Sequence, residues 1–455
     1  MKHARITIAF AVTLLSFVGT SHALGLKEYV AKPDDSYAYK IESTTPAGTN
    51  TVYFVQMTSQ TWRGIPWKHW LVVIKPQVVK HPDKALLLIS GGDNTDGRPG
   101  LDSDEARALS MIAQQMNALV SILMQVPNQP LFDGKTEDGI IAYTFEQFLK
   151  GQGDDWPLLL PMVKSAVRAM DAVQTIAKEQ FKQDIKQFMV TGASKRGWTT
   201  WLTGVADPRV IAIAPMVIDT LNMAPQMRHQ LDCYGAYSDE VKDYTERGIQ
   251  AAMQSDAGKR LLSIVDPYSY REALTLPKIM ILGTNDEYWT IDAAKFYFND
   301  LKGEKYLHYE PNAGHGLNLN IVPCIVAMLK EALTGQKLPQ LHWQTLPDGS
   351  IEASWDNAEG KAALWQAQSP TRDFRRVKWT SAPIEGDRKA TAKVAAPETG
   401  WAAYYMAVTF PVTLDATSLQ ADGKEVSVPM QYPYSLCTLS NVVPDTFPEH
   451  AKVTE

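Results

Sequence analysis

The hydrophobic pattern changes twice along the chain, which divides it into three regions. In the first region, segments 37–43, 51–57 and 70–75 are rich in strand-forming residues and are separated by Gly, Pro and Asn, which predicts antiparallel strands. From residue 85 onward, runs such as 85–90 and 119–124 are apolar at consecutive positions. Strands buried on both faces show such runs, so the second region is predicted to contain a parallel sheet.

Helix-like segments alternate with these apolar runs through the second region. Segment 156–177 places apolar residues three and four positions apart, and Pro157 suits a first helical turn, so a helix is predicted there. Further strands are predicted over 185–191, 210–217, 278–282 and 305–309, and further helices over 104–115, 292–300 and 318–334. This alternation predicts an α/β fold with a mostly parallel sheet and helices on both of its faces.

One connection in the second region is much longer than a simple crossover requires. About sixty residues separate the predicted strands 210–217 and 278–282, and they contain helix-like segments at 238–252 and 258–265. We therefore expect a helical insertion over about 220–275. It is interpreted as a cap over an active site, and a plain helical insertion without a gating role is the alternative.

The third region begins near residue 338, where the pattern changes to short strands. These are predicted over 341–345, 350–355, 362–366, 376–380, 390–395 and 401–410. Closely spaced strands with turn signals such as Pro347-Asp348-Gly349 predict a small β-sandwich of the immunoglobulin or fibronectin type. The predicted organisation is an α/β domain over 24–337, a β-sandwich over 338–440 and a tail over 441–455.

The first residues have the pattern of a signal peptide. Lys2 and Arg5 precede an apolar stretch over 6–18 that is too short to span a bilayer, and Ser21-His22-Ala23 fits a cleavage site. We expect residues 1–23 to be removed, which leaves a periplasmic or secreted protein without a stable membrane anchor. An uncleaved anchor is the alternative.

Composition limits the classes of function. The chain has 455 residues, 45% hydrophobic and 21% charged, and a net charge of −6, so it is an ordinary globular protein with no basic surface for nucleic acid. Its three cysteines, Cys233, Cys324 and Cys437, are widely spread. They allow at most one disulfide bond and match no metal-site spacing, so no cofactor is expected.

The strongest chemical motif lies directly after the predicted strand 185–191. Ser194 stands in Gly192-Ala193-Ser194-Lys195-Arg196-Gly197, between small residues and before a helix-like run. An α/β-hydrolase presents its nucleophilic serine in such a strand-to-helix turn, where bulky neighbours do not fit. The usual pattern is G-x-S-x-G, whereas here the second glycine comes one residue later.

An acid and a base follow Ser194 in the chain order that this fold uses. Asp286 comes directly after strand 278–282, and His315 stands between glycines after strand 305–309. Two other acids remain alternatives, because Glu287 is adjacent and Asp219 follows the strand before. The sequence therefore predicts a Ser194, Asp286 and His315 triad on an α/β-hydrolase fold.

An acyl-transfer site also needs N–H donors for the oxyanion. The backbone N–H of Lys195 is one candidate, and the loop at Gly92 and Asp93 supplies the second. The side chains of Lys195 and Arg196 place positive charge near the serine. They either favour an anionic substrate or an oxyanion, or are solvated or form salt bridges to the cap. Arg196, Asp219 and Glu287 are the residues predicted to border the substrate pocket.

Four segments also resemble the PhoPQ-activated pathogenicity-related protein family. They are 155–162 (DWPLLLPM), 169–173 (AMDAV), 191–199 (TGASKRGWT) and 283–287 (GTNDE). The resemblance implies a secreted or periplasmic α/β-hydrolase-like protein. For bacterial members it implies a link to the PhoP/PhoQ regulon and to resistance to membrane-active peptides. For eukaryotic relatives it implies secreted repressors of cell proliferation.

Two classes of function follow. The first is a serine hydrolase that cleaves an ester or amide bond of a small-molecule or peptide substrate through an acyl-serine. An esterase is favoured, because the G-x-S-x-x-G spacing is similar to that of some carbohydrate esterases, and a serine peptidase is the alternative. The second class is a binding or signalling protein on a hydrolase scaffold. Sequestration of cationic peptides by an acidic surface is a third hypothesis, which the net charge supports only weakly.

Overall fold

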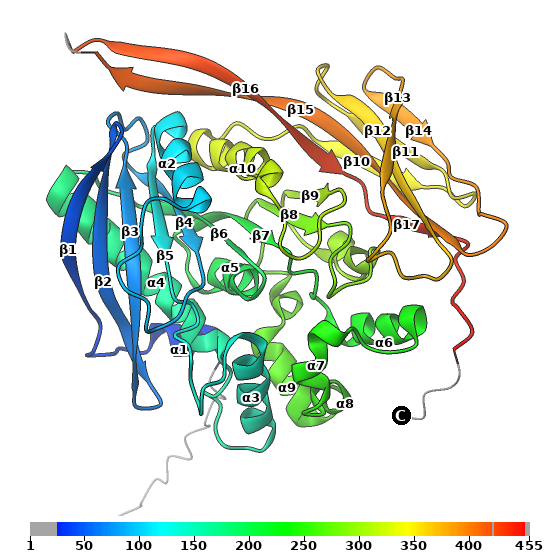
Figure 1. Ribbon diagram of the computed structural model, residues 1–455, viewed down its shortest axis with the longest axis horizontal. Helices are drawn as coiled ribbons and strands as arrows, with labels where there is room; N and C mark the ends of the chain where they lie inside the picture. The colour runs from blue at the N-terminus through cyan, green and yellow to red at the C-terminus, as the bar shows by residue number, and fades with distance from the viewer. Residues whose placement is uncertain (1–24, 421–422, 451–455) are drawn as a thin grey trace, which may run out of the picture.

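A mixed sheet of nine strands runs through the part of the chain that our computed structural model describes, residues 25–420 and 423–450 (Figure 1). The predicted signal peptide, residues 1–23, lies outside these residues. The strands are β1 (Ala38–Ala47), β2 (Asn50–Trp62), β3 (Ile65–Lys75), β4 (Lys84–Ile89), β5 (Leu119–Leu123), β6 (Gln187–Ala193), β7 (Val210–Met216), β8 (Lys278–Gly283) and β9 (Lys305–Glu310).

The order of the strands in this sheet is β1-β2-β3-β5-β4-β6-β7-β8-β9. The first three strands are antiparallel to one another, and β3 also pairs antiparallel with β5. All neighbours from β5 to β9 are parallel. The antiparallel start and the parallel continuation are both confirmed, and with them the predicted α/β-hydrolase fold.

Helices cover both faces of the sheet, as predicted. Side chains of β4 alternate between two cores: Leu86 and Leu88 belong to one, and Leu87 and Ile89 to the other. Helices α2 (Asp104–Met116) and α10 (Val322–Thr334) contribute to the first core, and α1 (Leu26–Ala31), α4 (Leu159–Ile176) and α5 (Lys195–Ala206) to the second. Among the described helices, none combines the length and the apolar character that crossing a bilayer requires.

The helical insertion between β7 and β8 is also confirmed. It contains α6 (Met223–Tyr234), α7 (Lys242–Thr245), α8 (Ile249–Ala252) and α9 (Asp256–Val265). Helices α7, α8 and α9 pack against α3 (Glu137–Leu149), which comes from the connection between β5 and α4 (Figure 1). The insertion and α3 together therefore form a layer beyond the carboxyl ends of the parallel strands.

Some predicted helices differ in detail. The helix expected over 238–252 is interrupted at Gly248, whose φ of +68° is left-handed and separates α7 from α8. The segment 292–300 forms only two 3₁₀ turns, Ala293–Phe296 and Phe298–Asp300. The sequence analysis did not predict helices α3 and α6. Their apolar residues face the pocket and the neighbouring helices of the insertion layer instead of the main sheet.

The C-terminal region consists of antiparallel sheets. One sheet has the order β10-β11-β14, and the other has the order β13-β12-β15-β16, with β17 also paired to β15. The strands are β10 (Leu341–Thr345), β11 (Ile351–Trp355), β12 (Lys361–Ser369), β13 (Thr380–Ile384), β14 (Lys389–Ala392), β15 (Trp401–Leu419), β16 (Glu425–Cys437) and β17 (Asn441–Val443). Strand β17 falls in the predicted tail, so the sheet extends beyond residue 440.

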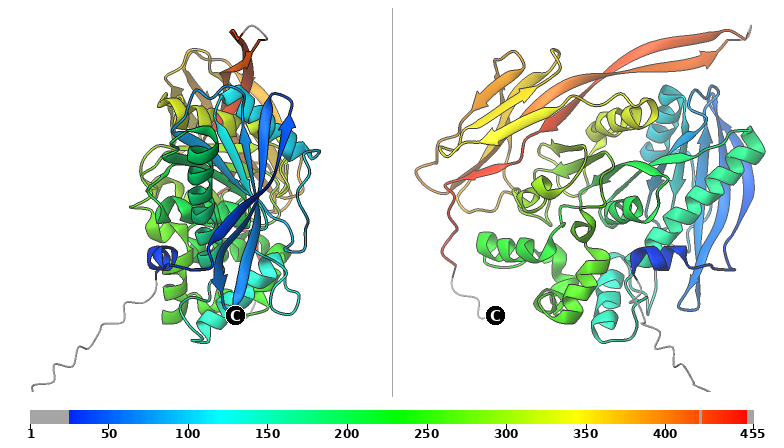
Figure 2. Two further views of the ribbon diagram at one scale, coloured as in Figure 1. Left: turned by 90° about the vertical axis from the view of Figure 1, so that its left-hand side faces the viewer. Right: turned by 180° about the vertical axis from the view of Figure 1, so that it is seen from behind.

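Strand β15 is apolar on both faces because it separates two cores. Tyr404 and Met406 pack in the core that includes β11 and β14, whereas Ala403 and Tyr405 pack towards the α/β domain. Tyr405 and Tyr309 of β9 have ring centroids 5.0 Å apart. Beyond this contact, β15 and β16 continue as a long ribbon over α2 and α10 (Figures 1 and 2).

Cys233, Cys324 and Cys437 are buried and free. Cys437 Sγ accepts the backbone N–H of Tyr309 at 3.4 Å, so this cysteine contributes to the contact between the C-terminal region and β9. The three cysteines therefore belong to packed interiors.

Candidate active site

Ser194 occupies a strained turn between β6 and α5. Its φ of 57° and ψ of −126° are a conformation that residues other than glycine rarely adopt. The Ser194 N–H donates to the Met216 carbonyl at 2.8 Å, and the Trp198 N–H donates to the Ser194 carbonyl at 2.9 Å. Neighbouring strand and helix thus hold the serine in a conformation that projects its hydroxyl away from the sheet.

Steric contacts explain the glycines of this turn, including the displaced one. A Cβ atom on Gly192 would lie 2.8 Å from the Arg196 carbonyl oxygen. A Cβ atom on Gly197 would lie 2.8 Å from the Met216 carbonyl oxygen and 2.9 Å from that of Gly192. All three distances are too short for a side chain, so the G-x-S-x-x-G spacing meets the same need for close packing as the usual pattern.

Three side chains from separate loops form one hydrogen-bonded line at this turn. His315 Nε2 lies 2.8 Å from Ser194 Oγ, and His315 Nδ1 lies 3.0 Å from both carboxylate oxygens of Asp286. When Nδ1–H donates to the carboxylate, Nε2 is free to accept the proton of the serine hydroxyl. The structure therefore brings together all three residues that the sequence predicts for catalysis.

The two alternative acids lie elsewhere. Glu287 Oε2 accepts the backbone N–H of His315 at 2.8 Å, so this carboxylate holds the histidine loop instead of the imidazole. Burial, together with the charge of Asp286, raises the pKa of Asp219 to about 8. A carboxyl group that is protonated at neutral pH cannot stabilise an imidazolium, so Asp286 is the acid that the geometry favours.

The predicted oxyanion donors differ in whether their backbone N–H groups are already hydrogen-bonded within the protein. Lys195 is the first residue of α5, so its backbone N–H has no carbonyl one turn earlier in the helix. The Asp93 N–H, in contrast, donates to the Asp96 carboxylate at 2.6 Å. Asp93 is therefore engaged in its own loop, and Gly92, with a φ of +121°, is the remaining candidate there.

Ion pairs occupy both cationic side chains next to Ser194. Arg196 Nη1 and Nη2 donate to the two carboxylate oxygens of Glu137 at 2.8 and 2.7 Å. Lys195 Nζ donates to Asp138 at 2.8 Å, and its side chain is only 9% exposed. Burial opposes ionisation of Glu137, but the Arg196 guanidinium outweighs it and lowers the pKa of Glu137 to about 2. The first turn of α3 thus neutralises both cations.

Asp138 and Tyr288 are site residues that the sequence prediction missed. Asp138 also accepts hydrogen bonds from the hydroxyl groups of Tyr244 at 2.8 Å and Tyr288 at 3.2 Å. The Tyr288 ring lies against the His315 imidazole, with centroids 4.2 Å apart. Tyr288 is two positions after the predicted acid Asp286, which is a usable signal. No sequence signal pointed to Asp138, because α3 was not predicted.

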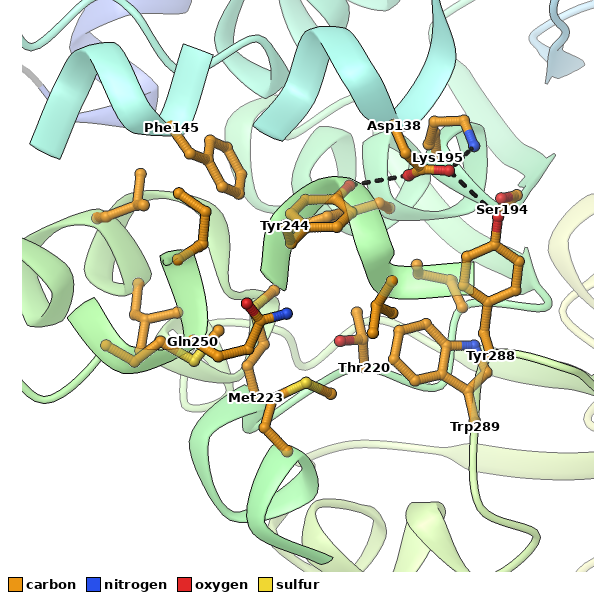
Figure 3. Close-up of a pocket in the computed structure, with 18 of the residues that line it drawn as sticks. Asp138, Phe145, Ser194, Lys195, Thr220, Met223, Tyr244, Gln250, Tyr288 and Trp289 are labelled. Atoms are coloured by element: carbon orange, nitrogen blue, oxygen red, sulfur yellow. Dashed lines mark hydrogen bonds and ion pairs between the residues drawn. The ribbon is translucent and has the colours of Figure 1, made fainter. Parts of the chain in front are cut away.

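A pocket of about 770 Å³, including solvent at its mouth, opens beside Ser194 and His315 (Figure 3). Its walls come from α3, from the start of α5 and from the insertion helices, and its lining side chains are mostly apolar. The predicted pocket residues Arg196, Asp219 and Glu287 do not line this cavity. Arg196 is held by Glu137, Asp219 is buried behind Asp286, and Glu287 faces the backbone of the histidine loop.

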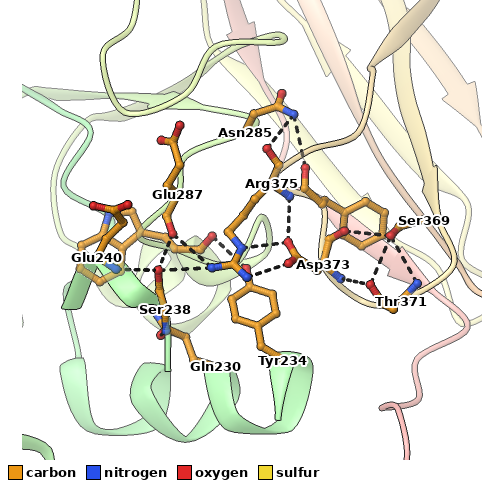
Figure 4. Close-up of polar contacts among 12 residues, drawn as sticks. Gln230, Tyr234, Ser238, Glu240, Asn285, Glu287, Ser369, Thr371, Asp373 and Arg375 are labelled. Atoms are coloured by element: carbon orange, nitrogen blue, oxygen red, sulfur yellow. Dashed lines mark hydrogen bonds and ion pairs between the residues drawn. The ribbon is translucent and has the colours of Figure 1, made fainter. Parts of the chain in front are cut away.

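A loop of the C-terminal region contacts both catalytic loops, and Figure 4 shows its contact with Asn285 of the acid loop. The Asn285 side-chain amide donates to the backbone carbonyls of Phe374, Arg375 and Val377, and the last of these distances is 2.7 Å. Asn312 Nδ2 donates to the Trp379 carbonyl at 3.1 Å, and the Trp379 N–H donates to Asn312 Oδ1 at 2.7 Å. Loop 369–379 therefore holds the neighbour of Asp286 and the start of the His315 loop.

Arg375 adds a second set of contacts from the same loop (Figure 4). Its guanidinium is paired with Asp373 at 2.6 Å and lies over the Tyr234 ring, 4.1 Å from the centroid. Arg375 Nη1 also donates to Ser238 Oγ at 3.2 Å, and Ser238 Oγ donates to the Glu287 carbonyl at 2.7 Å. The loop thus joins the acid loop to the insertion.

One buried group of side chains has the composition of a metal site. His229, Cys233 and Asp292 each place a potential ligand atom within 4.8 Å of the others. However, Asp292 already accepts hydrogen bonds from His229 at 2.7 Å, Lys295 at 2.7 Å and Arg372 at 3.1 Å. Because two cations already neutralise the carboxylate, the residues fit an ion-pair network between α6 and the C-terminal region better than a metal site.

Comparisons with known proteins agree with this architecture. The family model described as PhoPQ-activated pathogenicity-related protein matches residues 26–375. Autocrine proliferation repressor protein A from Dictyostelium discoideum is 32% identical over 483 residues, which cover 95% of this chain and 96% of that protein.

Solved structures also resemble parts of the chain at low identity. The acetyl xylan esterase from Paenibacillus sp. R4 is 14% identical with a TM-score of 0.47, and the match covers 68% of this chain and 92% of that one. Acetyl xylan esterase 1 from Thermoanaerobacterium sp. JW/SL YS485 is 15% identical with a TM-score of 0.47, covering 67% and 93%. The acylaminoacyl peptidase of Pyrococcus horikoshii is 10% identical with a TM-score of 0.41, covering 68% and 51%.

Proposed function

The chain belongs to the PhoPQ-activated pathogenicity-related protein family, and we propose that this member is a serine hydrolase that cleaves an ester or amide bond. One observation carries the proposal: Ser194 Oγ, the His315 imidazole and the Asp286 carboxylate form a continuous hydrogen-bonded line in a strained turn beside a pocket. The fold alone does not decide the activity, since many functions share it.

The reaction follows from the positions of the donors and acceptors. Ser194 Oγ attacks the substrate carbonyl carbon while its proton passes to His315 Nε2. The carbonyl oxygen becomes an oxyanion, which the Lys195 N–H stabilises. His315 then gives the proton to the leaving alcohol or amine, and an acyl-Ser194 ester remains. Water, deprotonated by His315, hydrolyses this ester and restores the serine.

Labelling with a fluorophosphonate probe tests this proposal directly. The probe reacts with an activated serine, so we expect covalent labelling of wild-type chain 24–455 and its loss in Ser194→Ala. Ser381→Ala changes an exposed serine of β13 and is the matched control, which should label like the wild type. Labelling that does not depend on Ser194, together with no hydrolysis of simple esters or peptide amides, would refute the proposal.

The identity of the relative favours a second candidate function, binding or signalling without catalysis. That relative is named as an autocrine proliferation repressor and aligns with nearly the whole chain. The same substitution separates the two functions, because Ser194→Ala removes catalysis but leaves the surface unchanged. A biological effect that persists in Ser194→Ala belongs to the second function.

Location and biological role are also proposals. The predicted signal peptide supports a location in the periplasm or outside the cell, and the family resemblance supports a contribution there to resistance to membrane-active peptides. Fractionation of cells that express the full chain, with sequencing of the mature N-terminus, tests the location. A deletion strain complemented with wild type or with Ser194→Ala tests the role.

A further inference from the structure

We propose that the pocket beside Ser194 receives an uncharged, apolar arm of the substrate, such as an alkyl chain or a hydrocarbon ring. This inference rests on the proposed hydrolase function and names the substrate class for the same site. Three observations support it: the chemistry of the pocket walls, the pairing of every charge near the serine, and the origin of the walls in the helical layer.

The pocket walls are apolar on nearly every side. Figure 3 shows the cavity between α3 and the insertion helices, with Ser194 at one end and Gln250 at the other. The apolar lining residues are Phe145, Leu149, Trp198, Ile218, Met223, Met227, Val241, Ile249, Met253, Leu261, Leu262 and Trp289. A hydroxyl-rich or charged group in this space would lose its hydration and find few new hydrogen-bond partners, chiefly the side chains of Thr220 and Gln250, whereas a hydrocarbon gains free energy there.

The charged residues that line the pocket are already paired. Lys195 is bound to Asp138, and His315 is bound to Asp286 and Ser194. Asp138 also accepts hydrogen bonds from the two tyrosine hydroxyls of Tyr244 and Tyr288. An anionic or cationic substrate group would therefore have to displace an existing ion pair in a buried position, which is costly. An uncharged group avoids this cost.

Methionines form much of the wall that the insertion contributes. Met223, Met227 and Met253 line the cavity, and their unbranched side chains adapt to ligands of different shape. We therefore expect a preference for apolar arms in general and a gradual dependence on their length. Each buried methylene group adds about fourfold to kcat/KM as long as the pocket accommodates it.

The test uses two series of esters. In one series methyl esters carry acyl chains from acetyl to decanoyl, and in the other acetate esters carry alcohols from methanol to decanol. Initial rates are followed by pH-stat below the micelle concentration of each ester. We expect kcat/KM to rise with chain length in the series whose variable arm enters the pocket and to stay nearly constant in the other.

A variant that fills the pocket ties the preference to this cavity. Met253 is partly exposed, packs against the core and lines the pocket, so Met253→Trp places a larger ring in the space. It should abolish the rise of kcat/KM with chain length, and fluorophosphonate labelling of Ser194 shows that the triad is still assembled in the variant. Met111, 43% exposed on α2 and outside the pocket, provides the matched control Met111→Trp, which should keep the wild-type preference.

The outcomes separate this inference from the proposed function. Ser194-dependent hydrolysis of methyl acetate without a rise in either series, or a rise that Met253→Trp leaves intact, overturns the inference and leaves the hydrolase proposal standing. Absence of both hydrolysis and fluorophosphonate labelling overturns the hydrolase proposal, and the inference with it.

Discussion

The two loops that carry Asp286 and His315 contact different parts of the chain through different interactions. On the pocket side, α3 and the insertion present apolar side chains. By contrast, loop 369–379 of the C-terminal region makes directional hydrogen bonds through Asn285 and Asn312. Hydrogen bonds fix position because they depend on angle and distance, whereas apolar contact depends mainly on area.

This difference suggests a division of roles. The polar side sets where the acid and the base stand, and the apolar side sets what binds next to the serine. Substitutions on the polar side should therefore lower kcat and leave chain-length preference unchanged. Substitutions on the apolar side should change the chain-length preference and leave kcat unchanged.

The largest effect is expected for the acid itself. Asp286→Asn retains the shape of the side chain but leaves His315 without the charge and tautomer that it needs, so kcat should fall about ten-thousandfold. The dependence of kcat/KM on chain length should stay as in the wild type. Steady-state kinetics on both ester series measures the two quantities. A change in the chain-length preference would contradict the proposed division of roles.

The ion pair between Lys195 and Asp138 in the pocket wall should matter most for stability. Lys195→Met leaves the backbone N–H in place but strands Asp138 without its cation, which should lower the free energy of unfolding by about 3 kcal/mol. Urea denaturation measures the change. Lys393→Met removes an exposed partner of Asp348 and should be almost neutral. Equal effects of the two substitutions would contradict the importance of burial.

Loop 369–379 is expected to affect the position of the catalytic acid, Asp286. Asn285→Ala removes the side-chain donor to three carbonyls of loop 369–379, and a small shift of the neighbouring Asp286 should lower kcat about tenfold with KM unchanged. Asn357→Ala, in the turn between β11 and β12, where Asn357 accepts a hydrogen bond from the backbone of Glu359, is the control and should keep the wild-type kcat. If KM rises while kcat is constant, the loop influences binding and the division is wrong.

A pH-dependent effect on stability is expected for Asp219, which lies behind the acid. Burial raises its pKa from 3.8 to about 8, so its contribution to stability is full below about pH 4 and is lost as the pH rises through 8. Asn does not titrate, so Asp219→Asn should gain stability relative to the wild type between pH 4 and 8, with a constant difference above. Thermal midpoints across this range test the sign. A difference that shrinks as the pH rises would mean that Asp219 is ionised in the folded protein.

Local patterns predicted most of the fold. The apolar runs that became β4 to β9, and the helices α2, α4 and α10, depend on residues close in sequence. The prediction failed for elements whose packing partners are distant in the sequence. Helix α3 packs against the insertion, and among the described strands the 13-residue β16 pairs with β15. Neither element has a strong signal of its own, because its apolar face is defined by a neighbour that the local sequence does not contain.

The residues of the site also fall into a group that the sequence identified and a group that it missed. Ser194, Asp286 and His315 are recognisable because each follows a predicted strand in the order that the fold requires. The partner of Arg196 was not recognisable, since Glu137 lies 59 residues earlier and belongs to a helix that was not predicted. The side chains that were predicted to border the pocket lie outside it in the structure, because charge in the sequence does not show which charges pair in space.

The sequence by itself determined the order of strands and turns, the serine turn with its glycines, and the candidates for the nucleophile, the acid and the base. These features follow from local sterics and from apolar periodicity, which act between near neighbours. Only the tertiary structure decided which acid contacts His315, how Lys195 and Arg196 are neutralised, and that an apolar pocket and a polar loop contact the catalytic loops. Such contacts join residues that are distant in the chain, so they exist only when the whole fold brings their elements together.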